Sequence, residues 1–176
     1  MRRSPLVEPF RRRRQSRPGP RVERGAAIVE FALVVPLFLL LVMGIIDFSN
    51  AFNDYNSVRQ GVREGARQIV VADWSTDGCT SGTSSVRAAC VTRARVGLNT
   101  ADTKVRIELP STYAPGEQVT VCVMYPFRSL TGLFSPVLNG GVARSKLTMR
   151  IESIDETDPI ATYEDTPLTG QGWSWC

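Results

Sequence analysis

Two sets of residues in this chain have types and spacing that suit ionic or covalent chemistry. The first is a single carboxylate, Glu30, which lies inside a long apolar run and five residues after Gly25. If the peptide bond after Gly25 is cut, the new amine on Ala26 lies one helical turn from Glu30, where the two charges can pair. The second set is four cysteines, an even number that forms two disulfides in an oxidising compartment.

The cysteines all follow the apolar run, on the side that we expect outside the cell. Cys79 and Cys90 are close in sequence and form the favoured local pair, which leaves Cys122 with Cys176. Three connectivities are possible for four cysteines, and free buried thiols are the alternative. The chain has no histidine and no C-x-x-C spacing, so a zinc site has little support. We predict no metal ion.

Residues for catalysis are scarce. Without histidine the chain lacks the commonest general base near neutral pH. No glycine-rich phosphate loop occurs, and the acidic residues near the C-terminus lack the spaced ligands and central glycine of a calcium-binding EF-hand loop. We therefore predict a protein that is not an enzyme and binds no cofactor.

The element that positions Glu30 is an apolar helix next to a strongly basic leader. Residues 1–24 hold nine arginines and two glutamates, a net charge of +7, whereas the rest of the chain has a net charge of −3. The 21 residues from Ala26 to Ile46 form about 32 Å of helix, which matches a hydrocarbon core of about 30 Å. Because arginines stay cytoplasmic, we expect a disordered cytoplasmic leader over 1–24, a transmembrane helix over 25–47 and the remainder outside. The basic leader serves membrane orientation in this interpretation, and nucleic acid is not an expected partner.

Three interpretations of this segment are open. A cleaved secretory signal has a small-x-small site at Ser49-Asn50-Ala51, but its apolar region is normally shorter. A plain single-pass anchor makes Glu30 incidental. A signal cut on the cytoplasmic side after Gly25 explains both the basic block and the carboxylate, because cleavage removes the leader and creates the cation that Glu30 needs in lipid. The third interpretation explains most of the observations.

Beyond the membrane we predict a helical stalk over 48–72 and an α+β domain over 73–176. The stalk is expected from apolar residues at spacings of three and four, which share one helical face: Phe48, Phe52, Tyr55, Val58, Val62, Ala66 and Ile69. The pair Gly61 and Gly65 suits either close approach to another helix or packing of the stalk on its own sheet.

The domain is expected to hold a short helix and three antiparallel strands. Ser84 or Ser85 is the predicted cap of a helix over roughly 85–98. Alternating patterns predict strands at Lys104–Leu109, Gln118–Tyr125 and Leu147–Ile151. Residues 126–143 are expected to form a long loop, and the acidic segment 152–167 to be a loosely ordered, solvated tail. The sheet is expected to pack its apolar face on the stalk.

Residues 24–67 resemble the TadE-like family of pilin-like proteins of the tight-adherence (Tad) secretion and pilus system. The resemblance lies in the run from Arg24 to Leu33, in Pro36, in the run from Gly44 to Phe48, and in the element from Val62 to Arg67. Gly25 followed by Glu30-Phe31 is similar to the prepilin processing pattern of a small residue, a cut, four residues, glutamate and an aromatic residue.

The resemblance implies a minor pilin or pseudopilin for an adhesive pilus. It implies processing at Gly25 and Ala26 by a prepilin peptidase, and subunit packing through Glu30, Phe31 and Pro36. The implied partners are the lipid bilayer, other pilin or pseudopilin subunits and the Tad assembly machinery. The alternative is a single-pass binding or envelope module that the helix only tethers.

Overall fold

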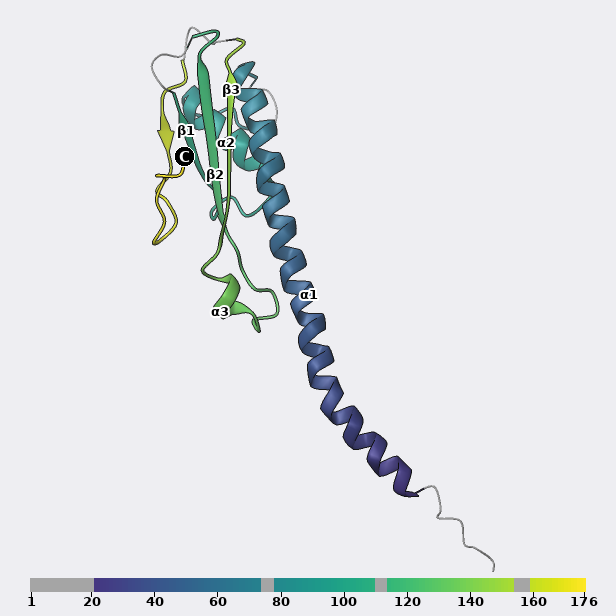
Figure 1. Cartoon of the computed structure of the whole chain (residues 1–176). Helices are drawn as coiled ribbons and strands as arrows, with labels where there is room; N and C mark the ends of the chain where they lie inside the picture. The colour runs from purple at the N-terminus through teal and green to yellow at the C-terminus, as the bar shows by residue number, and fades with distance from the viewer. Residues whose placement is uncertain (1–20, 74–77, 110–113, 154–158) are drawn as a thin grey trace, which may run out of the picture. The chain divides into compact units, whose positions relative to one another are not determined.

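The structure is a computed structural model that describes residues 21–73, 78–109, 114–153 and 159–176 (Figure 1). It has an α+β fold, as predicted: a long N-terminal helix, a short helix and a small antiparallel sheet. The chain divides into two units, residues 1–40 and 41–176, and each is described by itself.

Helix α1, Arg21–Val70, contains the apolar run and the predicted stalk without interruption. It begins four residues inside the predicted disordered leader, because no proline or glycine occurs between Pro20 and Gly25 to stop the helix. Residues 1–20 lie outside the described residues. α1 is long and apolar enough to span a membrane by length and composition, and the most apolar window within it is unburied.

The apolar stripe on the second half of α1 was predicted to be buried along its whole length, but only part of it is buried. Val58, Val62 and Ile69 are fully or almost fully buried, but Phe48 and Phe52 are exposed. The core to which the helix contributes begins at Tyr55, so the stripe has no sheet to cover it at its first two positions.

Four strands form one antiparallel sheet in the order β3-β2-β1-β4. β1, Lys104–Glu108, and β2, Gln118–Pro126, coincide closely with predicted strands, and Ile107 pairs with Val121 across them. β3, Val142–Arg150, begins five residues before the predicted Leu147, because the polar stretch 142–146 is an edge segment that pairs with β2. The fourth strand, β4, Tyr163–Glu164, lies in the segment predicted to be a loose tail.

Helix α2, Ser84–Val96, differs from prediction at its start. Thr83 is the N-cap residue, and it makes no capping hydrogen bond through its side chain. Ser84 and Ser85 are already helical and are used elsewhere: Ser84 Oγ accepts from Arg87, and Ser85 Oγ bonds to the backbone of Ala161. The helix ends at Gly97 in the left-handed conformation, near the predicted end.

The two faces of the sheet are covered by different parts of the chain. α1 and α2 contribute to one core with the inward side chains of the central strands, such as Val105, Val119 and Val121. Cys122 and Met124, which alternate to the other face, pack with Trp173 from the C-terminal segment. The structure joins Cys122 to Cys176 and Cys79 to Cys90, the connectivity favoured above by the short spacing of the first pair.

Candidate functional site on the N-terminal helix

The predicted processing and packing residues all lie on the first half of α1 and are open to their surroundings. Gly25, Ala26 and Glu30 are exposed, and Phe31 is 71% exposed. A Cβ built on Gly25 meets nothing within 4 Å. In the part of the chain that the structure describes, no hydrogen bond or ion pair reaches Glu30.

Ala26 and Glu30 lie four residues apart within one helix, so both project from the same face. Pro36 sits inside the helix, where the residues before it are helical too. Pro36 is exposed, and membrane helices tolerate such a proline when other groups satisfy the freed backbone carbonyl. The arrangement can therefore supply one carboxylate and a large apolar surface to contacts outside the chain.

Further along α1, Asp47 makes the most concentrated set of hydrogen bonds on the helix. It is completely buried. Its Oδ1 accepts from the backbone N–H groups of Leu130 and Thr131, both at 2.9 Å. Its Oδ2 accepts from the Ser129 hydroxyl at 2.6 Å and from the Thr131 hydroxyl at 2.7 Å. We call this arrangement the Asp47 clasp.

The clasp holds the connection between β2 and β3, residues 127–141, which we call the strap. The strap is partly ordered rather than a plain loop, because it contains the short helix α3, Ser135–Leu138. In Figure 1 the strap extends from the end of the sheet to the middle of α1. The Phe134 ring lies 5.7 Å from the Phe48 ring, and a Cβ on Gly44 would meet it at 3.2 Å. A side chain at position 44 would therefore press on the strap.

The pair Gly61 and Gly65 packs on α2, not on the sheet. A Cβ on Gly61 would lie 2.5 Å from the Val96 backbone, and one on Gly65 would lie 2.7 Å from the Thr92 hydroxyl. Real Cβ contacts are longer than this, so the two helices approach closely only because both residues are glycine. The small-residue spacing thus serves the packing of the domain on itself.

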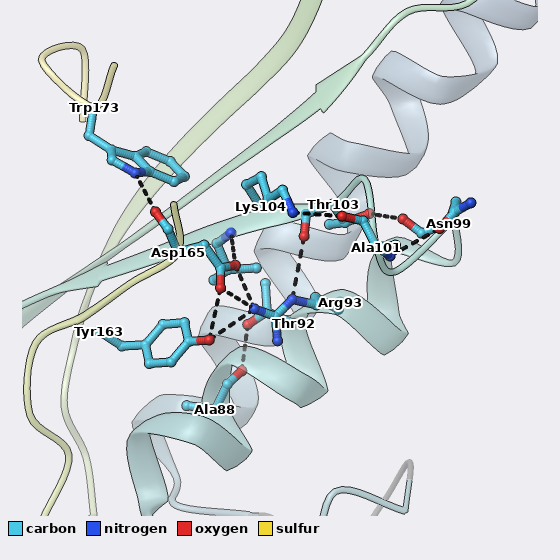
Figure 2. Close-up of polar contacts among 11 residues, drawn as sticks. Ala88, Thr92, Arg93, Asn99, Ala101, Thr103, Lys104, Tyr163, Asp165 and Trp173 are labelled. Carbon is cyan, nitrogen blue, oxygen red and sulfur yellow. Dashed lines mark hydrogen bonds and ion pairs between the residues drawn. The ribbon is translucent and has the colours of Figure 1, made fainter. Parts of the chain in front are cut away.

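The segment predicted to be a solvated acidic tail contains a partly buried polar network, which Figure 2 shows. The Arg93 guanidinium donates to both carboxylate oxygens of Asp165 and to the Tyr163 hydroxyl. Asp165 also accepts from the Val105 backbone N–H at 2.8 Å, and its carbonyl accepts from Trp173 Nε1 at 3.0 Å. This network and the Cys122–Cys176 disulfide attach the C-terminal segment to the sheet. The other acidic residues of the predicted tail at 154–158 lie outside the described residues.

Sequence reasoning quoted Asp47 as part of the family resemblance but gave it no role. The available signal was Ser129-Leu130-Thr131-Gly132, a turn-forming sequence whose hydroxyls and N–H groups suit a carboxylate. Nothing in the sequence paired that turn with Asp47, since more than eighty residues separate them.

Comparison with known proteins gives one match. Residues 25–67 match a protein family described as TadE-like protein, over about a quarter of the chain. No curated protein and no solved structure matches the chain. The matched stretch contains Gly25, Glu30, Asp47 and the Gly61–Gly65 pair, and it ends just before α1 does. The similarity to the TadE-like family thus covers this part of helix α1 and does not extend to the sheet.

Proposed function

We propose that this protein is a minor pilin or pseudopilin of a Tad-type pilus system, anchored in the cytoplasmic membrane with its N-terminus cytoplasmic and its α+β domain outside. The observation that carries the proposal is the exposed carboxylate of Glu30 on an unburied apolar helix, within the stretch that matches the TadE-like family. An anchor needs an apolar helix but no charge within it. The proposal gives the protein a structural role in pilus assembly and no catalytic activity.

Glu30 is the register residue in this proposal. A carboxylate costs about 3 kcal/mol at the bilayer centre and less near its edge, so an unpaired one weakens insertion. After cleavage behind Gly25, the Ala26 amine of the same or a neighbouring subunit neutralises it. Phe31 and Pro36 then shape the apolar surface on which subunits pack. A prepilin peptidase and the Tad machinery are the partners that this proposal requires.

Processing is tested by the N-terminus of the protein purified from its own membranes, by intact mass and N-terminal peptide. A start at Ala26 supports the proposal. A start at Phe52 means a secreted domain and overturns the membrane assignment. A start at Met1, or loss of Met1 alone, favours a stable anchor.

Assembly is tested by Glu30→Leu in the cells that make the protein. Val34→Leu is the matched control, because Val34 is an exposed apolar residue of the same helix. We expect both variants at normal levels in the membrane, with Glu30→Leu alone lost from the sheared surface fraction that contains pili. If Glu30→Leu leaves pilus output intact, the register role is wrong and the tethered binding module is the better function.

A further inference from the structure

Exposed apolar side chains are concentrated on the strap. Beyond residue 53, the described residues include five large apolar side chains that are exposed, and three of them belong to the strap: Leu130 at 73%, Val137 at 67% and Leu133 at 49%. The neighbouring strand β3 follows the ordinary pattern, with polar residues such as Arg144, Lys146 and Arg150 at its exposed positions. The strap thus carries three of these five side chains, and we call Leu130, Leu133 and Val137 the apolar patch.

The clasp fixes where this patch lies along α1. Asp47 binds the strap backbone, and Phe134 contacts α1 at Gly44 and Phe48. These contacts place the strap beside the turn at which the apolar run of α1 ends. The helix residues at the same level, Ile45 and Ile46, are themselves exposed and apolar. The strap therefore lies at the level of the last turn of the apolar helix.

We infer that the strap is a second membrane contact, in which Leu130, Leu133 and Val137 lie in the headgroup and acyl boundary of the leaflet on the domain's side. With α1 anchored in a membrane, as proposed above, a lipid surface surrounds the helix where its apolar run ends and meets the strap that the clasp holds there. Apolar side chains on a short amphipathic segment bury about 5–10 Å into this boundary. The exposed rings of Phe48 and Phe52 suit the same zone, since Phe and Leu occupy the apolar face of helices that lie at membrane interfaces.

Asp47 makes this contact possible. Its carboxylate satisfies two backbone N–H groups and two hydroxyls of the strap, which would otherwise enter the boundary with open hydrogen-bonding groups. The strap thus exposes Leu130, Leu133 and Val137, while the hydroxyls of Ser129 and Thr131 bond to Asp47. The contact between the strap and lipid also sets the distance of the sheet from the membrane surface.

The test uses the full chain in lipid nanodiscs with a fluorophore on one introduced cysteine. The described cysteines are joined in disulfides, so Leu133→Cys supplies a single free thiol. Val86→Cys is the matched control, because Val86 is also apolar and exposed. It lies near the far end of α1: Val96 faces Gly61 and Thr92 faces Gly65, so α2 runs antiparallel to α1 and brings its start toward residue 70.

Lipids with a spin label near the headgroup end of the acyl chain quench a fluorophore within the boundary. We expect quenching at position 133 about twofold or more above that at position 86, because only the former enters the interface. Leu130→Cys should behave as Leu133→Cys does. Equal quenching at 133 and 86 overturns the inference. Fluorophores at 133 that quench one another between copies, without quenching by lipid, would assign the patch to a second copy and overturn it as well.

The inference rests on the membrane anchor and not on pilus assembly. A failure of Glu30→Leu to affect pili therefore leaves it standing, and absence of lipid quenching leaves the assembly role standing.

Discussion

Replacement of Asp47 by leucine should release the strap from α1 without unfolding the sheet. The change removes an acceptor for four hydrogen bonds at once and leaves the strap donors without their partner. Asp47→Asn is the graded companion. Its amide oxygen can still accept from the two N–H groups, and its NH₂ can donate to the two hydroxyls, which accept as readily as they donate.

The magnitude follows from the environment of each partner. Hydrogen bonds to a charged group contribute about 1.5–3 kcal/mol each when both groups are buried. Asp47 is buried, but Leu130 and Thr131 lie in an exposed connection, so the released strap can leave the lipid boundary and pair its donors with water. We therefore expect about 3 kcal/mol in total for Asp47→Leu, well below the sum of four buried bonds. For Asp47→Asn, which loses only the charge, we expect about 1 kcal/mol.

Amide hydrogen exchange in lipid nanodiscs measures this directly. A cost of about 3 kcal/mol raises the opening equilibrium, and with it the exchange of the Leu130 and Thr131 amides, about a hundredfold, because 1.4 kcal/mol is a factor of ten. Asp47→Asn should raise it about fivefold. Amides at the centre of β2, such as Val121, should not change. Asn50→Ala is the matched control, because Asn50 lies one turn further on and, among the described residues, its side chain bonds back to Ile46 within α1.

Unchanged exchange at residues 130 and 131 in Asp47→Leu would refute the reasoning, since the strap would then be held by Phe134 and its own turns. A uniform rise across β2 would refute it differently, by showing that the clasp supports the whole domain.

Three further predictions concern the domain. Gly61→Ala should destabilise it by about 1–3 kcal/mol, because the new Cβ would lie 2.5 Å from the Val96 backbone, whereas Gly140→Ala, which meets open space, should change little in the same thermal unfolding experiment. Cys176→Ser should lower stability by up to about 4 kcal/mol in the chain-entropy description, since its disulfide closes a loop with a sequence separation of 54. A reducing agent should lower the Tm of the parent by more than that of the variant, which keeps only the Cys79–Cys90 bridge. Burial raises the pKa of the Tyr125 hydroxyl in the folded state above its ordinary value of about 10 in the unfolded chain. Stability should therefore fall as pH rises past about 10, because the unfolded state loses this proton first. Tyr125→Phe should flatten this part of the plot of stability against pH.

Local patterns predicted the elements with their own periodicity. The apolar run and the stripe through Val58 and Val62 gave one long helix, and β1 and β2 alternate clearly enough to be placed within one residue. Periodicity reports the face of an element that a core covers. It therefore failed at Phe48 and Phe52, where the helix extends past the end of the sheet and the stripe stays exposed.

The elements that depend on distant partners were missed. The first half of β3 has a polar sequence and is a strand because β2 beside it needs hydrogen-bond partners. β4 is only two residues long and is held by Asp165, which binds Arg93 and the Val105 backbone. Composition alone places such a carboxylate in solvent, and only the fold shows that it is paired. The predicted helix cap at Ser84 or Ser85 was wrong for the same reason. The Ser85 hydroxyl bonds to the backbone of Ala161, a distant residue, and does not cap its own helix.

Two carboxylates on helix α1, Glu30 and Asp47, differ in what they bind. Glu30 and Asp47 are both carboxylates within or at the end of the apolar run. The carboxylate oxygens of the exposed Glu30 are free to accept hydrogen bonds from another molecule. Those of Asp47 already accept four hydrogen bonds from donors of its own chain. A carboxylate whose acceptors are filled within the chain has none left to set subunit register. If one of the two sets subunit register, as proposed above, their burial favours Glu30, because only Glu30 has acceptors that another molecule can fill.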